Sequence, residues 1–253
     1  MTIDTFRRHG NNFRSGVVAF NGLMLNEEGK DEFDVTTETA ADDSEVGSFA
    51  IDFRNHAYSE IPTVIAFPNW FTSNGENQPA DTADVNFAIT SISETGFEIS
   101  HSQASSQSYL GFNFAVIGPD LSTKNIKHGI IAECTESGFT KDRYPKYGIA
   151  VANVELNDCT PNGEGNGSWN QELTGKASGV KIEFDVPFTD IPSVIATPFK
   201  DETPADVVRN GSVSRCTAEA ITRTFATVKC GVIDTAKKYR PIPFTFIAVG
   251  NSD

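Results

Sequence analysis

One residue whose type suits chemistry on a ligand is Trp169. It lies in the stretch GEGNGSWNQ, where glycine and asparagine offer a large ring little local core. The face of an indole stacks well on the C–H face of a sugar ring, so Trp169 is a candidate sugar-binding residue. The alternative is that the ring packs back onto the fold or onto a neighbouring subunit. Trp70 lies between Phe67 and Phe71 after an apolar stretch, which favours packing for that second indole.

The titratable residues form no pattern typical of catalysis. The four histidines, at positions 9, 56, 101 and 128, are scattered, and no Ser-His-Asp or Cys-His arrangement is evident. Two acidic loops repeat Pro-Ala-Asp, at 79–81 and 204–206, and carry oxygens of the kind that bind Ca²⁺. Their spacing differs from that of an EF-hand loop, so solvated turns are the favoured interpretation. We therefore expect a protein that is not an enzyme and needs no cofactor.

The four cysteines, Cys134, Cys159, Cys216 and Cys230, all lie in the second half of the chain. No C-x-x-C spacing or nearby histidine pair suggests zinc. Four cysteines allow three pairings, and the sequence alone does not choose between them. Free buried thiols are an equal alternative, because no export signal places the chain in an oxidising compartment.

The charge of the chain limits its partners. Its 34 acidic and 20 basic residues give a formal charge of -14, which repels phosphate backbones and anionic membranes, so nucleic acid is not expected as a partner. No run of 18 apolar residues occurs, and the opening MTIDTFRRHGNNFRSG lacks the apolar core of an export signal. We expect a soluble chain without membrane insertion, extracellular or virion-associated by a route without a signal, such as lysis of a cell by a virus.

The sequence contains two similar copies of one set of segments. Five pairs of segments match in the same order along the two copies. One pair is SEIPTVIAFPNW from Ser59 and TDIPSVIATPFK from Thr189, and the others include FRSGVVAF with IKHGIIAE and FNFAVIG with FTFIAVG. The offset between the copies is 113 at the first pair, 130 at the proline motif, 128 at Val85 and Val213, and 132 at the closing glycines. Offsets that change between segments indicate matched strands joined by loops of different length. The sequence thus predicts a tandem duplication.

The segments alternate with the period of a strand. FNFAVIG places Phe112, Phe114 and Val116 on one face, and turn sequences such as NG and ETG separate the segments. The predicted fold is all-β, with two tandem antiparallel β-sandwich domains of about six strands each. We expect an N-terminal arm at 1–12, copy one at 13–119, a linker at 120–125, and copy two at 126–253 with a long inserted loop around Trp169. The proline-led IP-x-VIA strand is apolar on both faces, so we expect a neighbouring domain or subunit to cover its outer face.

The order of the motifs resembles the H-type lectin domain of snail agglutinins and of the C-terminal half of discoidins. The resemblance rests on an opening strand with x-G-x-[IV], an acidic loop, an aromatic residue before [IP]-P-x-V, a V-x(n)-T-G-F strand and a closing aromatic-x-aromatic strand. It covers nearly all of each copy. It implies a six-stranded antiparallel sandwich that assembles as a homotrimer and binds galactose or N-acetylgalactosamine in clefts between protomers.

The resemblance also implies the positions of sugar contacts. The family's arginine position holds Asp84 in copy one and Ser212 in copy two, where Arg209 lies three residues earlier. The Trp-His positions hold Ala104-Ser105 and Ile233-Asp234, whereas the following tyrosine is kept in both copies. The candidate carbohydrate-binding residues are therefore Trp169, Arg209, Asp234, Tyr239 and Tyr109.

The family has a disulfide from its opening strand to the strand of the T-G-F motif. Cys134 and Cys230 fall near those two places, which implies a Cys134–Cys230 bond and leaves Cys159 with Cys216. Copy one has His101 near the second place and no cysteine, so the bond is not expected to be essential to the fold.

Two functions follow as expectations. The first is a carbohydrate-binding adhesion or recognition protein, a multivalent trimer that contacts cell-surface glycans. The alternative is a structural or attachment component of a larger assembly, such as a phage tail fibre, tail tip or decoration protein, in which the sugar sites have degenerated. The polar arm MTIDTFRRHGNNF, which could dock to such an assembly, and the altered arginine and Trp-His positions motivate the alternative.

Overall fold

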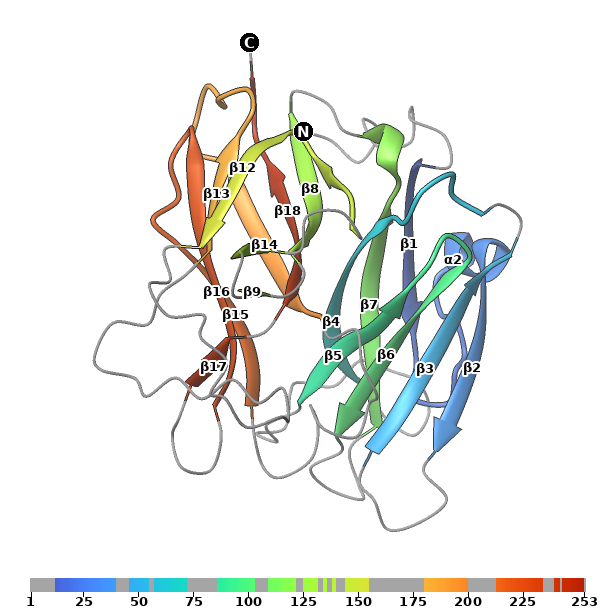
Figure 1. The fold of residues 1–253 in the computed structure, drawn as a ribbon. Helices are drawn as coiled ribbons and strands as arrows, with labels where there is room; N and C mark the ends of the chain where they lie inside the picture. The colour runs from blue at the N-terminus through green and yellow to red at the C-terminus, as the bar shows by residue number, and fades with distance from the viewer. Residues whose placement is uncertain are drawn as a thin grey trace. The chain divides into compact units, whose positions relative to one another are not determined.

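The computed structural model confirms the all-β class: strands dominate the described residues, which also include the short helix α2 (Glu27–Glu32) and a 3₁₀ turn at Pro119–Leu121 (Figure 1). The chain divides into two compact units. We call the described residues from 12 to 121 unit one and those from 125 to 252 unit two. The structure describes residues 12–39, 46–54, 57–71, 86–102, 109–121, 125–131, 134–135, 138–139, 144–154, 180–199, 213–233, 239–241 and 243–252.

Unit one consists of two antiparallel sheets. The first has the order β1-β7-β4 and the second the order β2-β3-β6-β5. The strands are β1 (Phe13–Val18), β2 (Phe33–Thr39), β3 (Val46–Phe53), β4 (Thr63–Phe71), β5 (Phe87–Ile92), β6 (Gly96–Ser102) and β7 (Tyr109–Ile117). Helix α2 lies between β1 and β2 in the sequence and contacts both.

Aromatic side chains join these two sheets. Phe49 of β3 meets Phe112 of β7 edge to face, with ring centroids 5.6 Å apart, and Phe97 of β6 meets Phe114 of β7 at 5.1 Å. All four rings are buried. Edge-to-face pairs at this spacing add to the hydrophobic gain from burial. The unit is therefore a sandwich whose core is built largely from phenylalanine, as the alternation in the sequence predicted.

Unit two repeats the plan. Its first sheet has the order β11-β8-β18-β14, and its second has β12-β13-β16-β15 with β17 paired to β16. A two-stranded ribbon of β9 and β10 completes it. The strands are β8 (Ile126–Ile131), β9 (Cys134–Thr135), β10 (Gly138–Phe139), β11 (Lys146–Tyr147), β12 (Ile149–Val154), β13 (Val180–Phe184), β14 (Ser193–Pro198), β15 (Val213–Glu219), β16 (Phe225–Ile233), β17 (Tyr239–Pro241) and β18 (Phe244–Val249).

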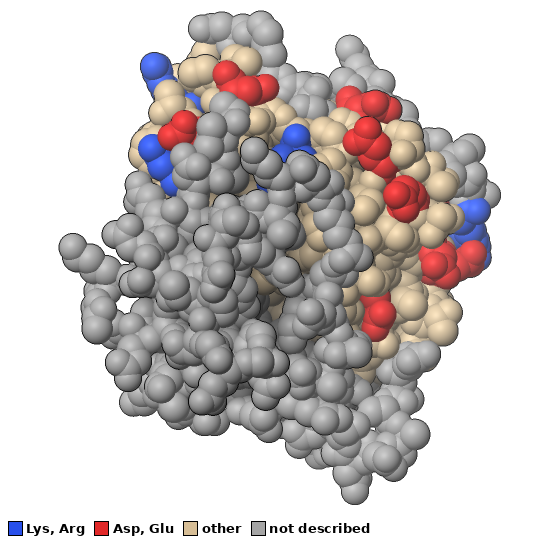
Figure 2. Space-filling view, in the orientation of Figure 1, with Lys and Arg blue, Asp and Glu red and all other residues tan. Residues whose placement is uncertain are grey.

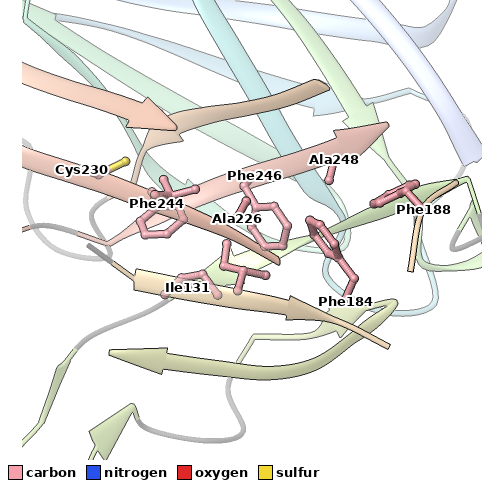
Figure 3. Packing of buried hydrophobic residues seen from close by; sticks show 10 residues of the cluster. Ile131, Phe184, Phe188, Ala226, Cys230, Phe244, Phe246 and Ala248 are labelled. Atoms are coloured by element: carbon pink, nitrogen blue, oxygen red, sulfur yellow. The ribbon is translucent and has the colours of Figure 1, made fainter. Parts of the chain in front are cut away.

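The core of unit two is also aromatic. Figure 3 shows Phe184 and Phe188 beside Phe246 and Ala248 of β18, with Ile131 of β8 nearby. The rings of Phe184 and Phe188 meet edge to face at 5.0 Å. Residues from both sheets thus bury one another, which makes this unit a second sandwich.

The two units agree in strand order and largely in register. Thr63 pairs with Ile117 in unit one, and Ser193 pairs with Val249 in unit two. Gly16 lies opposite Phe114, as Gly129 lies opposite Phe246. The hairpin turns match as well: the amide of Ser93 donates to the carbonyl of Gly96, and that of Thr222 donates to the carbonyl of Phe225, each at 2.8 Å. The repeat in the sequence is therefore a repeat of one three-dimensional unit.

The register corrects the sequence alignment by one residue. The offset of 128 found at Val85 and Val213 would pair Phe97 with Phe225. In the structure, Ile51 lies opposite Phe97 and its counterpart Ile182 lies opposite Ala226, which makes the offset 129. Phe225 stands in the place of Gly96, where its ring is partly exposed and lies 4.8 Å from the Lys181 ammonium. The two phenylalanines look equivalent in the sequence, but they point to opposite faces of the sheet. Successive residues of a strand alternate between its faces, so an error of one residue exchanges the faces.

The repeated proline motif differs in burial between the units. In β4, Thr63, Val64, Ile65 and Ala66 are all at most 3% exposed, so both faces of the strand are covered, as expected. In β14, Val194 and Ala196 pack against the core, but Ile195 is 41% exposed. The outer face of β14 is therefore partly exposed within this chain, and its cover by a neighbouring domain or subunit stays a prediction for copy two.

The surface charge is dispersed. Figure 2 shows Asp and Glu side chains scattered over the described surface, some of them beside Lys or Arg. Ion pairs join Arg54 to Asp34 at 2.6 Å, Lys181 to Glu183 at 2.9 Å, and Lys229 to Glu219 at 2.7 Å. Such exposed pairs contribute little to stability. In the described part of the chain, no helix has the length and apolar character needed to cross a membrane.

Replacing Gly16 with alanine should destabilise unit one by about 1 to 3 kcal/mol. A Cβ atom at Gly16 would lie 2.2 Å from the Phe114 ring, and that ring is held by Phe33 and Phe97, with centroids at 4.9 and 5.1 Å. Chemical unfolding followed by fluorescence measures the change. Ser15→Ala, on the opposite face of β1, is the control, and an equal midpoint for the two variants would contradict the packing argument.

Candidate functional site

Among the described residues, each unit buries a basic side chain between an aromatic ring and a carboxylate. Arg14 on β1 is 4% exposed; its guanidinium lies 4.9 Å from the Tyr58 ring centroid, and its Nε is 3.1 Å from Oε2 of Glu32. Its counterpart Lys127 on β8 is 1% exposed, and its Nζ lies 2.7 Å from Oδ1 of Asp185. Both positions belong to the matched opening segments, so the buried cation is a property of the repeat.

A pocket of about 290 Å³ opens beside the cation of unit one. Arg14 and Tyr58 are buried and form its floor, whereas Ala57, Ser59 and Asp120 are exposed and form its rim. The residues that line it are Asn12, Arg14, Ala57, Tyr58, Ser59, Pro119 and Asp120. They come from the start of β1, the loop before β4 and the 3₁₀ turn after β7. The pocket therefore lies wholly within unit one.

Backbone contacts hold the walls of this pocket together. The amide of Gly118 donates to the carbonyl of Asn12 at 2.7 Å, and the amide of Tyr58 donates to the carbonyl of Glu94 at 2.9 Å. A Cβ atom at Gly118 would lie 2.6 Å from the Tyr58 ring and 2.9 Å from Oδ1 of Asn12. Glycine at 118 is thus what lets the end of β7 approach these two side chains closely.

The phenol of Tyr58 is a donor without an acceptor. Its hydroxyl is buried and has no hydrogen-bond partner within the described residues. Burial raises the pKa of Tyr58 to about 12, against a lowering effect of Arg14, so the group keeps its proton at neutral pH. An unpaired buried hydroxyl costs on the order of 1 to 3 kcal/mol. The floor of the pocket therefore combines a cation with an unsatisfied neutral donor.

At the equivalent place in unit two, the polar groups form hydrogen bonds with one another. Phe188 replaces Tyr58 and carries no hydroxyl. The side-chain oxygen of Asn125, the counterpart of Asn12, accepts from the amide and hydroxyl of Ser252 at 2.8 and 2.9 Å. Thr189 donates from its amide and hydroxyl to the carbonyl of Asn251 at 2.7 and 3.0 Å. The copies share a cation but differ in whether the surrounding polar groups are already engaged.

Only two of the sugar-contact candidates fall within the described chain, and only by their backbone. Tyr109 begins β7, opposite Phe71 of β4, and Tyr239 begins β17, opposite Ile233 of β16. Trp169, Arg209 and Asp234 lie outside the described residues, as do the inserted loop and nearly all of the N-terminal arm. The structure therefore does not bring these five candidates together or separate them.

The pocket of unit one is not the site that the resemblance implied. Tyr109 starts β7, and the pocket lies beyond the other end of that strand, at Gly118 and Pro119. Eight steps along a strand at about 3.3 Å each separate Tyr109 from Ile117, or roughly 26 Å. The two places thus lie at opposite ends of the same sheet.

The acidic-loop candidates for calcium also lie outside the described residues: Asp81, Asp84, Asp201, Glu202 and Asp206. Within the ranges that the structure describes, no group of three or more His, Cys, Asp or Glu side chains is arranged to hold a metal ion. The solvated turns favoured for these loops over calcium sites therefore stay a prediction.

The disulfide implied by the resemblance is corrected. Cys216 of β15 is bonded to Cys230 of β16, so Cys230 does not pair with Cys134, nor Cys216 with Cys159. The physical reason is register: Cys216 and Cys230 lie directly opposite each other on neighbouring antiparallel strands, with Cα atoms 4.0 Å apart. Cys134 begins β9, and Cys159 lies outside the described residues.

Unit one fills the corresponding place with Phe87 and His101, which oppose each other on β5 and β6. The His101 ring lies 5.5 Å from that of Phe49 and 5.9 Å from that of Phe112, and its Nδ1 is buried without a hydrogen-bond partner. Burial lowers the pKa of His101 to about 4 and that of His128 to about 3. Both histidines of the described chain therefore stay neutral at pH 7 and serve packing.

The pocket was not predicted from the sequence, although the sequence carries a signal for the buried cation beside it. The alternation of FRSGVV points Arg14 to the same face as Gly16 and Val18, which is the core face of β1. An arginine on a core face, matched by Lys127 in the second copy, indicates a buried cation that needs partners. The distant partners Glu32 and Tyr58 had no such signal, because only the fold brings them to Arg14.

Comparisons of the chain with protein-family models, with curated proteins and with solved structures found no match. The lectin-like interpretation accordingly rests on the motifs of this sequence.

Replacing both Cys216 and Cys230 with serine should lower the free energy of unfolding by about 3 kcal/mol, because the bond closes a loop of 14 residues. Chemical unfolding of the double variant, beside the wild type with and without reductant, measures the loss. A peptide map under non-reducing conditions should show Cys216 linked to Cys230. Recovery of a Cys134–Cys230 peptide instead would contradict the assignment.

Stability should fall between pH 6.5 and about 4 through His101, and His101→Phe should reduce that fall. The folded pKa of about 4 lies below the unfolded value of 6.5, so in this window the unfolded chain takes a proton that the folded chain refuses. The stabilising effect of a neutral histidine is thus complete above pH 6.5 and lost as the pH falls. Melting temperatures of both proteins across this range provide the measurement. Parallel curves would show that His101 contributes nothing, since the carboxylates titrate equally in both.

Proposed function

We propose that this chain is a carbohydrate-binding adhesion or recognition protein that acts as a multivalent trimer on cell-surface glycans. The glycans are of the galactose or N-acetylgalactosamine type that the lectin-like motifs imply. No catalytic residues are assigned. The observation that carries the proposal is the repetition of one antiparallel sandwich in a single chain, with Tyr109 and Tyr239 each at the start of a strand after the central hairpin.

The strand starts at Tyr109 and Tyr239 are compatible with the motif order of the lectin-like family, although β7 pairs with β4 and β17 pairs with β16. In unit one, β6 ends at Ser102 and Tyr109 opens β7; in unit two, β16 ends at Ile233 and Tyr239 opens β17. A tyrosine directly after this hairpin is the sugar contact that the resemblance implies. Two copies per chain and three chains would present up to six weak sites, and simultaneous engagement raises avidity by orders of magnitude.

The remaining contacts are assigned to the second copy. Trp169 would stack on the sugar, Arg209 would donate to ring hydroxyls, and Asp234 would accept from them. Copy one has Asp84, Ala104 and Ser105 at the family's arginine and Trp-His positions. Copy two is therefore the stronger of the two proposed lectin sites.

The burial pattern of unit two supports assembly with other subunits. Ile191 is 69% exposed and Ile195, four residues on in an extended segment, is 41% exposed, whereas Ile65 of unit one is 3% exposed. Two exposed isoleucines on one side of an extended segment suit a surface that a partner covers. A neighbouring protomer on β14 would give the IP-x-VIA strand of copy two the cover that its sequence predicts.

The same exposed isoleucines suit the alternative function, a structural or attachment component of a larger assembly such as a phage tail fibre, tail tip or decoration protein. In that case another component of the assembly covers β14, and the altered sugar positions reflect a site that is no longer used. Co-purification with a virion or filament would favour this alternative.

A glycan array decides between the two. The wild type should bind galactose- or N-acetylgalactosamine-terminated glycans saturably, and Trp169→Ala or Tyr239→Ala should weaken binding roughly tenfold through the loss of an aromatic contact. Trp70→Phe, which changes the indole assigned to packing, should bind as the wild type does. Light scattering on the same samples should give three times the monomer mass.

The outcomes separate cleanly. A blank array at high protein concentration would overturn the lectin proposal, and a blank array from a stable trimer would point to the structural role. A monomer by light scattering would contradict the trimer that both functions require.

A further inference from the structure

We propose that the pocket of unit one, built on Arg14 and Tyr58, is a separate binding site for one small neutral polyhydroxylated molecule, such as a single sugar ring. It goes beyond the lectin-type site, because it lies at the opposite end of β7 from Tyr109 and contains none of the residues assigned to that site. Its residues also differ from those of unit two in the features that matter for binding.

The floor of the pocket offers donors to a ligand oxygen. Arg14 brings its positive charge and its Nε faces Glu32, while the protonated hydroxyl of Tyr58 has no acceptor among the described residues. A ligand hydroxyl that accepts from Tyr58 removes the cost of leaving that buried group unsatisfied. The occupant of the floor must therefore present an acceptor oxygen.

The rim offers the complementary groups. Asp120 is exposed and accepts hydrogen bonds, while Ser59 both donates and accepts, and Asn12 lies between floor and rim. A molecule with an acceptor at one end and donors at the other spans this arrangement. Vicinal hydroxyl groups meet both requirements because each one donates and accepts.

Charge decides against an anionic ligand. The positive charge of Arg14 is offset by Glu32, whose Oε2 lies 3.1 Å away, and Asp120 adds a second negative charge at the rim. A carboxylate or phosphate entering the pocket would meet the Asp120 carboxylate and a cation that is already paired with Glu32. In a partly buried site such like-charge contacts outweigh the attraction to a cation that already has a partner. The pocket is thus suited to a neutral ligand.

Size limits the ligand to one ring. The pocket volume of about 290 Å³ is at the lower limit of the range for small-molecule sites. The exposed rim leaves the far side of a bound ring open, so the ring can be free or the last unit of a longer chain. The aromatic face of Tyr58 is occupied by Arg14 at 4.9 Å, so recognition rests on hydrogen bonds rather than on stacking.

Unit two provides the internal comparison. At the equivalent positions it has Phe188 for Tyr58 and Ser252 for Asp120, and its Asn125 and Thr189 are bonded to the chain itself. The same sandwich therefore tolerates these residues. We infer one such site per chain, in copy one.

The test introduces the residues of copy two into copy one. Tyr58→Phe, Asp120→Ser and the double variant are compared with the wild type by saturation-transfer NMR titration with methyl mannoside, methyl glucoside and galacturonate; the two neutral glycosides are not of the galactose type assigned to the proposed lectin site. The wild type should bind a neutral glycoside, each single variant should weaken binding roughly fivefold to tenfold, and the double variant should abolish it. Asp52→Ser, which removes an exposed carboxylate elsewhere in unit one, is the matched control and should bind normally.

Each result is decisive for this site. Retained affinity in the double variant, or no wild-type binding to either neutral glycoside, would overturn the proposal, and tighter binding of galacturonate would overturn the charge argument. Melting temperatures equal to or above that of the wild type exclude misfolding as the cause of a loss, since Tyr58→Phe removes an unpaired buried hydroxyl. The titration repeated with Trp169→Ala and Tyr239→Ala should be unaffected, so this site and the proposed lectin site succeed or fail separately.

Discussion

The buried cation of each unit is the interaction on which its surroundings depend. Removing a charged side chain from water costs several kcal/mol unless a counter-charge and further contacts compensate. Unit one takes its carboxylate from Glu32 of α2, whereas unit two takes it from Asp185 directly after β13. The aromatic contact is kept in kind, as Tyr58 in one unit and Phe188 in the other. Both units therefore compensate a buried cation with a carboxylate and an aromatic ring, but they use different residues to do so.

The ends of the two sandwiches also differ in which polar groups are engaged. Where Asn125 and Thr189 bind their own C-terminal segment, the end of the unit-two sandwich is closed by the chain itself. Where Asn12, Tyr58 and Asp120 occupy the same places, polar groups remain around a pocket. A tandem repeat can therefore change one copy while the other maintains stability. The divergence lies at loop and strand ends, and the aromatic core between the sheets is kept in both copies.

Much of the fold could be predicted because strand geometry is written into adjacent residues. The alternation of FNFAVIG correctly placed Phe112, Phe114 and Val116 on the core face of β7. The same period set the limit of prediction, since a one-residue error in matching Phe97 to Phe225 exchanges the two faces. The predicted disulfide was wrong for a related reason: Cys216 and Cys230 lie opposite each other only because of the register between β15 and β16. Motif spacing alone did not contain that register.

The sequence by itself determined the all-β class, the duplication and the identity of the strand faces, because each of these depends on local alternation or on direct comparison of segments. Only the tertiary structure decided which groups surround Arg14, since Glu32, Tyr58 and Asp120 come from three distant parts of the chain. It also decided that Ile65 is covered and Ile195 is exposed, although both stand in the same motif. Burial and partnership are properties of what packs against a residue, and identical strings acquire different neighbours when the loops around them differ.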